Sequence, residues 1–336
     1  MRTDAVVFTA PNTVELGTVA CREAGPDDVV VRTTHSWISN GTEGSYLRGE
    51  RVDGDKAWIE GDKWPFPVVA GYQKIGIVEW IGDNIRDLEI GERVFVTIGF
   101  VEGMHHEYAG QVRHSVTPRS EVYKLPPTDD PLKYAGMVLT QVGFNGGMRP
   151  QFEQNAVAVV GGDGMVGQWT AQTLANRGAR VILLGRRAMR LDLFRSWATS
   201  RGYASACINT REETDLDLES VFGVKPSVGV DTVGSLEMMD TFSTQMHRFG
   251  HLVSAGFYGT DDRFALQPAR YGEHTIHLVS GWTRSRMEDT RKELQADKLD
   301  TLSLITHRFP VTEAPAAWEA IESHDPSVLG VILEWD

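Results

Sequence analysis

Cysteine is scarce in this sequence. Among 336 residues there are two, Cys21 and Cys207, so the chain can build neither a framework of several disulfides nor a zinc site with four thiolate ligands. No segment approaches 18 consecutive apolar residues, and the start of the chain lacks the charged and apolar regions of a secretory signal. These absences predict a cytoplasmic protein that does not enter the membrane.

Positive charge is also in deficit. The sequence has 33 Lys and Arg against 46 Asp and Glu, a net charge of -13, which repels the phosphate backbone of nucleic acids. Hydrophobic residues make up 41% and charged residues 24%, as in globular proteins. A length of 336 residues favours two domains. We therefore predict a two-domain globular protein whose partner is a small molecule rather than nucleic acid or membrane.

Two patterns divide the chain. The first part reads as short strands broken by Gly and Pro, at residues 29–34, 75–81, 93–97 and 122–125. From Asn155 the order becomes buried strand, glycine turn, helix and strand, which is typical of a parallel sheet with crossover helices. After Thr283 a charged helical stretch at 287–297 leads to a strand-rich tail at 329–335. We expect this tail to return to the first domain.

The strongest local motif follows the apolar run 156–160. It reads GGDGMVG at 161–167 and continues as a helical pattern to Asn176. Glycines at the second, fourth and seventh positions permit a tight turn, close approach of backbone N–H groups to a pyrophosphate, and close packing of the helix on the strand. The motif predicts dinucleotide binding rather than a glycine turn without a ligand. The residues assigned to the cofactor here are Gly162, Gly164, Met165, Val166 and Gly167.

The next strand, at 180–184, ends in Gly185, Arg186 and Arg187. Enzymes that use NAD usually place an acidic residue there to bind the ribose hydroxyls. Glycine leaves space instead, and two guanidinium groups can pair with a 2′-phosphate. The sequence therefore favours NADP(H), with Arg190 either assisting or lying on the surface. The alternative is that the arginines simply begin a solvated helix.

Further segments occur in the order found in the medium-chain dehydrogenase/reductase family, which this sequence resembles over essentially its whole length. They lie at 67–71, 91–94, 231–234 and 254–256. Four motifs resemble more closely the branch that contains bacteriochlorophyllide a dehydrogenase, at 34–43, 71–73, 255–258 and 304–307. Members of that branch act on a hydroxyethyl group of a tetrapyrrole, although one fold serves many substrates.

The resemblance implies an α/β architecture of two domains. A GroES-like β-rich catalytic domain would comprise residues 1–125 and 285–336, and a Rossmann domain, a doubly wound parallel sheet that binds NADP(H), residues 126–284. It also implies a homodimer. Further residues expected to bind the cofactor are Thr232, Ala255, Gly256 and Phe257.

Zinc-dependent relatives carry a Cys, then Gly-His-Glu, then a Cys or Glu near the domain junction. The matching positions here hold Ser39, then Tyr72 and Gln73, then the region 140–141, and none is a good zinc ligand. His105 and His106 are adjacent, and neighbours on a strand point to opposite faces, so only one could reach a given ion. We therefore expect an enzyme without zinc and without another metal site.

Without zinc, another group must stabilise the developing oxyanion. Tyr72 is the first candidate, because it stands in place of a metal-binding histidine and its phenol is protonated at neutral pH. It could instead be a packing aromatic. Ser39 and Thr42 could orient substrate or relay a proton, or could be turn residues. One of His105 and His106 could face the substrate as an acid or base, or both could be structural.

These observations predict a zinc-independent, NADP(H)-dependent oxidoreductase that interconverts a secondary alcohol and a ketone. Trp58 and Trp64 lie in a polar loop near the predicted active-site strand, which suits a carbohydrate or a ring-bearing substrate, or else a lid or subunit contact. Two alternatives remain open. One is a zinc-free enoyl or quinone reductase of the same fold, and the other is an NADPH-binding protein without catalytic activity.

Overall fold

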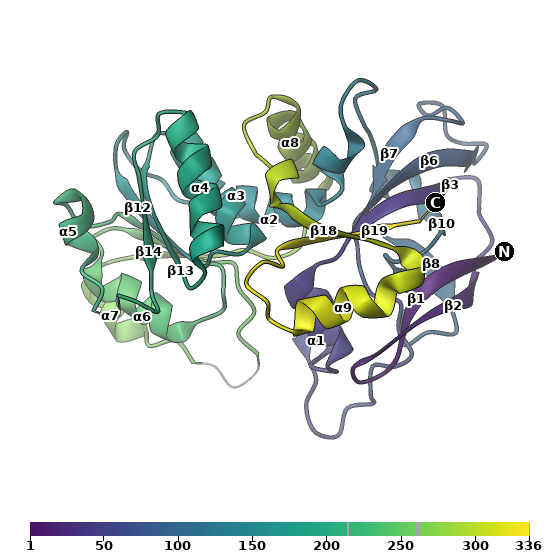
Figure 1. Cartoon of the computed structure of the whole chain (residues 1–336), viewed down its shortest axis with the longest axis horizontal. Coiled ribbons are helices and arrows are strands. Elements are labelled where there is room, and N and C mark those ends of the chain that lie inside the picture. Colours follow the sequence, from purple (N-terminus) through teal and green to yellow (C-terminus); the bar gives the residue numbers. More distant parts are fainter. Residues whose placement is uncertain (214, 260–262, 336) are drawn as a thin grey trace. The chain divides into compact units, whose positions relative to one another are not determined.

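The computed structural model describes residues 1–213, 215–259 and 263–335. The chain forms two compact units, Met1–Val138 with Thr301–Asp336 (unit 1) and Leu139–Asp300 (unit 2). In Figure 1 the C-terminal segment, in yellow, lies beside the purple N-terminal strands. Unit 1 is therefore built from both ends of the chain.

Unit 1 contains a seven-stranded sheet. Its strand order is β11-β7-β6-β3-β19-β18, and β10 also pairs with β3. The strands are β3 (Asp28–Trp37), β6 (Lys74–Ile81), β7 (Arg93–Val96), β10 (His114–Pro118), β11 (Val122–Lys124), β18 (Ile305–Pro310) and β19 (Gly330–Glu334). The C-terminal strand β19 pairs antiparallel with β3, so the tail returns to the first unit, as its pattern predicted.

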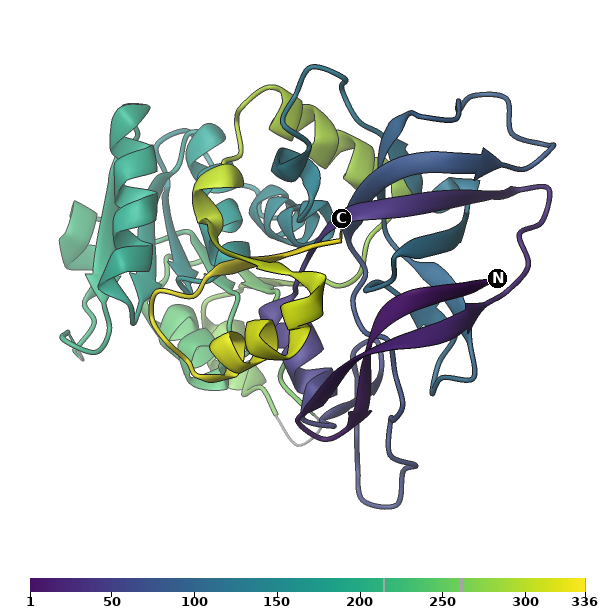
Figure 2. The same ribbon diagram turned by 45° about the vertical axis from the view of Figure 1, so that its right-hand side comes forward.

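A smaller sheet of unit 1 has the order β1-β2-β8-β9, and β4 and β5 form a separate hairpin (Figure 2). These strands are β1 (Arg2–Ala10), β2 (Thr13–Cys21), β4 (Arg51–Asp53), β5 (Lys56–Ala57), β8 (Gly99–Glu102) and β9 (Tyr108–Ala109). Helices α1 (Asn40–Leu47) and α9 (Ala314–Glu322) complete one hydrophobic core. In that core the rings of Phe8 and Trp318 meet edge to face, with centroids 5.4 Å apart.

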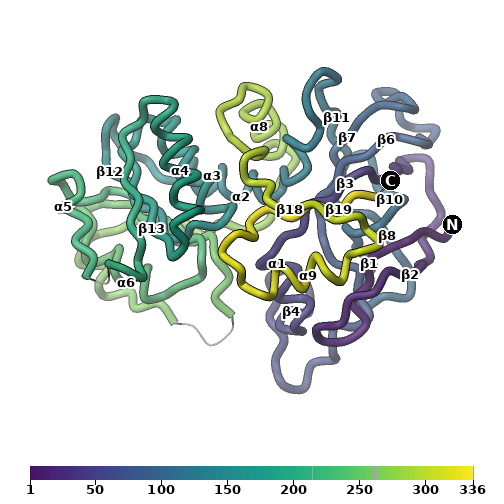
Figure 3. The backbone as a smooth tube through the Cα atoms, in the orientation of Figure 1, coloured from purple at the N-terminus to yellow at the C-terminus, as the bar shows by residue number. Residues whose placement is uncertain are grey.

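Unit 2 contains a six-stranded, wholly parallel sheet of order β14-β13-β12-β15-β16-β17. Figure 3 traces the backbone of this unit and labels β12 and β13 in it. The strands are β12 (Val157–Gly161), β13 (Arg180–Gly185), β14 (Ser205–Asn209), β15 (Val228–Asp231), β16 (His251–Ser254) and β17 (Thr275–Leu278). This is the order of a Rossmann doubly wound sheet. Successive strands of the chain are added on one side of β12 as far as β14, and on its other side from β15 onward. Ligands of such sheets bind at the carboxyl ends of the strands at that point.

Helices cover both faces of this sheet, so the inner strands β12, β13, β15 and β16 are largely buried, whereas the edge strands β14 and β17 are more exposed. One core packs α3 (Met165–Asn176) and α4 (Ala188–Ser200) on the sheet, and the other packs α5 (Leu218–Phe222), α6 (Leu236–Gln245) and α7 (Leu266–Tyr271). The chain passes from unit 1 to unit 2 within α2 (Met137–Met148), and α8 (Arg284–Gln295) is the last helix of unit 2. Among the described residues, no helix has both the length and the apolar character needed to cross a bilayer.

Two segments lie in a different unit from the one the sequence suggested. Residues 126–138 belong to unit 1, where Thr301 Oγ1 donates a hydrogen bond to the carbonyl oxygen of Lys133 at 2.7 Å. Residues 285–300 belong to unit 2, where Trp169 Nε1 donates to the carbonyl oxygen of Asp300 at 2.8 Å. The unit to which each segment belongs depends on its packing against residues far away in the sequence. A change in the local sequence pattern does not reveal such packing.

Candidate active site

The glycine motif forms a turn between β12 and α3 in unit 2. Gly162 has φ +117°, which favours glycine, and a Cβ on Gly167 would lie 1.9 Å from the carbonyl oxygen of Gly162. Gly164 is the N-cap of α3, where no side chain caps the helix, and a Cβ there would meet open space. The first N–H groups of the helix, including those of Met165 and Val166, therefore face a cradle suited to a pyrophosphate.

A carboxylate lies at the end of β13, where sequence reasoning found no acid. Asp163, from within the glycine motif, accepts hydrogen bonds on Oδ2 from the backbone N–H groups of Arg186 (2.7 Å) and Arg187 (2.8 Å). A Cβ on Gly185 would lie 2.5 Å from the Cβ of Asp163. This acid is part of the glycine motif itself, whereas NAD-dependent enzymes usually place one about 20 residues further on.

Two guanidinium groups lie near this carboxylate. The Nη1 atoms of Arg187 and Arg190 lie 3.5 Å and 3.7 Å from Asp163 Oδ1, and Arg186 is exposed. Arg190 is buried rather than on the surface, and burial, with Arg187 adding to the effect, lowers its pKa to about 10. Positive charge thus exceeds negative charge at the end of β13.

The loops after β15 and β16 meet at the same edge of the sheet. Thr232 Oγ1 donates to the carbonyl oxygen of Gly161 at 2.8 Å, which holds the loop after β15 against the glycine turn. The N–H of Ala255 donates to the carbonyl oxygen of Asp231 at 2.8 Å. A Cβ on Gly256 would lie 2.0 Å from the nitrogen of Gly234, so the segment that continues to Phe257 packs tightly on this loop.

Sequence reasoning missed the part played by Asp231. Its buried carboxylate accepts from the N–H groups of Val233 (3.0 Å), Gly234 (2.9 Å) and Ser235 (2.9 Å), and from the hydroxyl of Tyr258 at 2.5 Å. One side chain therefore shapes both loops. The structure brings all the residues assigned to the cofactor to one edge of unit 2.

Three hydroxyl groups gather in unit 1. The Tyr72 hydroxyl donates to Ser39 Oγ at 2.6 Å, and Thr42 Oγ1 lies 3.3 Å from the same phenolic oxygen. Ser39 is buried at the start of α1, whereas Thr42 is partly exposed. Burial raises the pKa of Tyr72 above its ordinary value, so the phenol keeps its proton over a wide pH range.

A buried carboxylate holds the start of α1 in place. Glu43 Oε1 accepts from the N–H of Ser39 at 2.8 Å, and Glu43 Oε2 accepts from Gln111 Nε2 at 3.0 Å. Gln111 Oε1 in turn accepts from Ser36 Oγ at 2.5 Å, and Ser36 Oγ accepts from Trp335 Nε1 at 2.8 Å. Burial raises the pKa of Glu43 to about 7. Glu43 thus positions Ser39 through the backbone N–H of that residue.

The two histidines do not lie on a strand, so the argument that their side chains point to opposite faces was wrong. They lie in the bend between the end of β8 at Glu102 and the start of β9 at Tyr108. His105 Nε2 lies 3.1 Å from the carbonyl oxygen of Val52. The ring of His106 lies edge-on to Tyr46, with centroids 5.8 Å apart, and burial lowers its pKa.

The aromatic residues of the following loop stack on one another. The rings of Trp58 and Trp64 are 4.8 Å apart at 18°, and Trp64 continues the stack onto Phe66 at 6.4 Å. Trp64 is 51% exposed. The stack thus leaves one indole accessible to solvent.

The donor atoms near Tyr72 do not suit zinc. Ser39 and Thr42 offer hydroxyl groups, where zinc prefers thiolate, imidazole or carboxylate. In unit 2, Gln141 donates from Nε2 to the carbonyl oxygen of Gly281 at 3.4 Å. Over the described ranges of the chain, no group of three or more His, Cys, Asp or Glu side chains is placed to hold a metal ion.

Known proteins were compared with this chain at the level of sequence. No model of a protein family matches it. The 2-desacetyl-2-hydroxyethyl bacteriochlorophyllide A dehydrogenase of Cereibacter sphaeroides is 27% identical over 351 residues, which cover 100% of this chain and 99% of that protein. Sorbitol dehydrogenase of Mus musculus is 25% identical and covers 94% of this chain and 91% of its own length. These relatives support a place in the medium-chain dehydrogenase/reductase family, which the motifs of the sequence resemble.

Solved structures agree with the fold of this family. A zinc-binding dehydrogenase of Sinorhizobium meliloti, bound to NADP, has a TM-score of 0.80 at 18% identity and covers 100% of both chains. The 2R,3R-butanediol dehydrogenase of Bacillus subtilis has a TM-score of 0.84 at 13% identity and covers 99% of this chain and 100% of its own. The predicted medium-chain dehydrogenase/reductase fold, a GroES-like unit with a Rossmann unit, is confirmed.

Proposed function

We propose that this protein is an NADP(H)-dependent oxidoreductase that interconverts a secondary alcohol and a ketone without catalytic zinc. The observation that carries the proposal is the Tyr72 hydroxyl, hydrogen-bonded within a set of hydroxyl groups in unit 1. The relatives support the reaction class, because their names describe dehydrogenases of a hydroxyethyl-bearing bacteriochlorophyllide and of a polyol. The proposed location is the cytoplasm.

The edge of unit 2 fits a dinucleotide. The uncapped start of α3 and the open space at Gly164 would receive the pyrophosphate. Arg186 and Arg187 would pair with a 2′-phosphate, which argues for NADP(H) over NAD(H). When bound, the nicotinamide supplies or accepts the hydride. Asp163 orients this segment through its two backbone N–H contacts.

Tyr72 would act on the substrate oxygen. In the direction of reduction, its phenol donates a hydrogen bond to the carbonyl oxygen and then transfers its proton as negative charge develops there. The raised pKa of the phenol, caused by burial of its hydroxyl group, keeps the proton available until the oxyanion forms. In the direction of oxidation the same proton returns from the alcohol to the phenolate.

Ser39 and Thr42 would restore the proton on Tyr72. Both hydroxyl groups lie within hydrogen-bond distance of the phenolic oxygen, and each can donate or accept. Because Thr42 is partly exposed and Ser39 is buried, the path to solvent runs through Thr42. His105 and His106 remain candidate acids or bases of the reaction by their residue type, and their contacts to Val52 and Tyr46 favour a structural role.

The test measures cofactor choice and metal dependence together. Metal-stripped protein is titrated with NADPH and with NADH, and turnover is followed on a panel of cyclic, polyol-derived and tetrapyrrole ketones with and without a chelator. Preferential NADPH binding with turnover that the chelator does not change supports the proposal. Chelator-sensitive turnover contradicts the zinc-free mechanism. Hydride addition to conjugated carbon instead would indicate an enoyl or quinone reductase, and binding without turnover a non-catalytic protein.

A further inference from the structure

A chain of hydrogen bonds runs through the core of unit 1 from Trp335 to Glu43 in α1. Trp335 Nε1 donates to Ser36 Oγ at 2.8 Å, and Ser36 Oγ donates to Gln111 Oε1 at 2.5 Å. Gln111 Nε2 then donates to Glu43 Oε2 at 3.0 Å. Each of these four residues is at most 1% exposed, so water does not compete for their hydrogen bonds.

The two ends of this chain fix the direction of every bond in it. The indole N–H of Trp335 can only donate, so Ser36 Oγ accepts from it and gives its single proton to Gln111. Gln111 receives that proton on its carbonyl oxygen, which turns its amide NH2 group toward Glu43. At the other end, the backbone N–H of Ser39 donates to Glu43 Oε1 at 2.8 Å. Both oxygen atoms of the Glu43 carboxyl group therefore face donors.

This arrangement favours the carboxylate form of Glu43. A protonated carboxyl group has to donate, and neither an N–H nor an amide NH2 group can accept. Turning the amide of Gln111 round would supply an acceptor. Ser36 Oγ would then receive bonds from two donors, and its own proton would lose its partner. Burial opposes these bonds and raises the pKa of Glu43 to about 7, although the contacts to Ser39 and Gln111 lower it.

The chain also reaches the segment that carries Tyr72. A Cβ on Gly71, which has φ +90°, would lie 3.0 Å from Gln111 Nε2, so the amide packs on the backbone directly before Tyr72. Burial is the main cause of the raised pKa of Tyr72, and the charge of Glu43 adds to the rise while that of Arg51 opposes it. The charge of Glu43 thus acts on the phenol as well as on the start of α1.

We propose that this hydrogen-bond chain keeps Glu43 ionised and thereby positions the Ser39 hydroxyl that accepts from Tyr72. Trp335, Ser36 and Gln111 are then positioning residues, which act through Glu43 rather than on the substrate. The catalytic consequence rests on the proposed function, whereas the effect of the chain on the charge of Glu43 does not. When Glu43 gains a proton, its carboxyl group no longer has an acceptor in place, and the contact that fixes Ser39 weakens.

The test follows the carboxyl group of Glu43 itself. Its 13C chemical shift is titrated over about pH 4–9 in protein labelled at glutamate, with Glu43→Gln to assign the signal. In Ser36→Ala the ionised arrangement loses the donor to Gln111 Oε1, so we expect the midpoint to rise by about half a pH unit or more. Gln111→Met, which removes the donor to Glu43, should raise it further.

Ser115→Ala is the matched control. Ser115 is 1% exposed and lies in β10 of the same unit, and its hydroxyl has no hydrogen-bond partner within the described ranges. Its replacement should leave the Glu43 midpoint at the wild-type value. Thermal melting of each variant shows that a change in the midpoint is not a loss of fold.

Turnover tests the catalytic consequence. Near pH 7, Ser36→Ala should lower kcat for ketone reduction about twofold or more with little change in KM, and a higher pH should restore it, because Glu43 is then ionised in both proteins. A merely structural role of Ser36 would not give this recovery.

Two results would overturn the proposal. One is an unchanged Glu43 midpoint in both Ser36→Ala and Gln111→Met, and the other is a raised midpoint with wild-type kcat at every pH. A wild-type protein that reduces no ketone would refute the proposed function alone, and the carboxyl titration would still decide whether the chain fixes the charge of Glu43.

Discussion

The phenolic oxygen of Tyr72 lies 2.6 Å from Ser39 Oγ, and Ser39 is itself fixed through its backbone N–H by Glu43. A residue from the segment before β6 is thereby joined to the start of α1. The buried carboxylate of Glu43 fixes the Ser39 end of this hydroxyl pair, while Tyr72 as a residue is partly exposed. This arrangement suits a proton donor that must keep one orientation.

Replacement of Tyr72 tests this role directly. In Tyr72→Phe the ring remains and the proton donor is lost, so we expect kcat for ketone reduction to fall about 100-fold or more, with a smaller change in KM. Steady-state kinetics on the best ketone measures the effect. Tyr203→Phe is the matched control, because it removes a phenol that donates to Asn176 Oδ1 at 2.8 Å in unit 2. Equal activity in Tyr72→Phe and wild type would exclude the mechanism.

Cofactor choice depends on Arg187. In Arg187→Gln we expect the dissociation constant for NADPH to rise about tenfold or more, because a charge-assisted hydrogen bond to phosphate is lost, while that for NADH changes less than about threefold. Fluorescence titration with both cofactors measures this. Arg195→Gln, an exposed residue of α4 paired with Asp192, is the control. An equal loss for both cofactors would mean that Arg187 supports the fold rather than a 2′-phosphate.

Local sequence patterns were enough to predict the strand–turn–helix order of unit 2 and its glycine turn. The order strand, glycine, helix is short-range, and the constraints at Gly162 and Gly167 arise within a few residues. The contacts around Asp163 were missed, because they depend on where β13 ends in space. Likewise Trp335 and Ser36 are 299 residues apart and share a hydrogen bond. Such contacts leave no periodic signal in the sequence.

The bend at His105 and His106 shows a second limit of predicting structure from the sequence. A pair of polar residues near a strand fits either a strand or a loop, and alternation alone cannot separate the two. Asn145 Nδ2 and Arg286 Nη1 show a third limit, since their lack of hydrogen-bond partners among the described residues follows from helix packing. Residue type indicated chemistry in each case, but tertiary structure determined what each group contacts.

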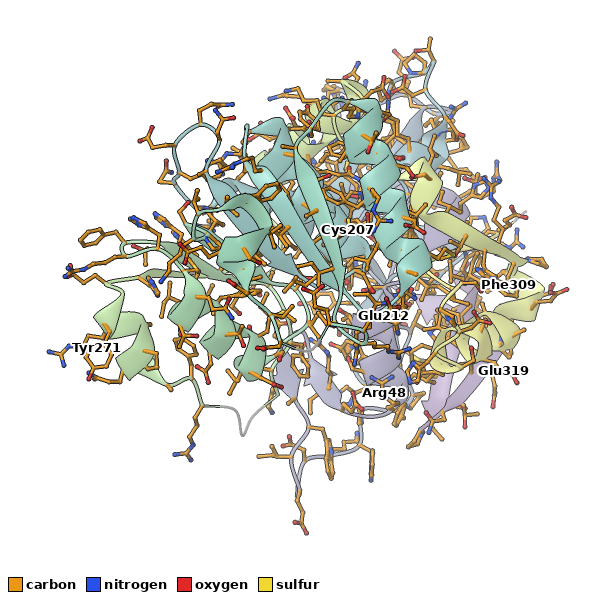
Figure 4. All side chains as sticks on the ribbon, turned by 60° about the vertical axis from the view of Figure 1, so that its left-hand side comes forward. Arg48, Cys207, Glu212, Tyr271, Phe309 and Glu319 are labelled. Carbon is orange, nitrogen blue, oxygen red and sulfur yellow. The ribbon has the colours of Figure 1, made fainter. Side chains whose placement is uncertain are left out.

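The predicted homodimer is tested at the edge of the parallel sheet. Strand β17 lies at the end of the strand order, Leu278 on it is 77% exposed, and Tyr271 before it is 76% exposed. Figure 4 shows Tyr271 pointing into solvent. Open apolar edges invite pairing with another chain. We expect light scattering to show a dimer that Leu278→Lys dissociates and that Leu302→Lys, in unit 1, leaves intact. A monomeric wild type would refute the prediction.

Lys74 provides a test of stability. Its side chain is fully buried in β6, where Nζ donates to the carbonyl oxygens of Thr97 (3.2 Å) and Ala109 (3.3 Å), and burial lowers its pKa from 10.5 to about 7. Between pH 7 and 10.5 the unfolded chain therefore holds a proton that the folded chain has released. In this window the contribution of Lys74 makes the free energy of unfolding rise with pH. Below pH 7 the folded protein bears the full cost of charging the buried amine, at most about 5 kcal/mol.

In Lys74→Met this cost disappears, although two carbonyl oxygens lose a donor. We expect a net gain of about 1–3 kcal/mol at pH 7 and little or no gain near pH 10. Urea denaturation at both pH values measures the difference. Lys124→Met is the control, because Lys124 is exposed and its Nζ lies 2.8 Å from Glu92 Oε1 in the same sheet. The opposite result would be a loss of stability in Lys74→Met that is larger at pH 7 than at pH 10. It would mean that the buried amine stabilises the fold in its charged form.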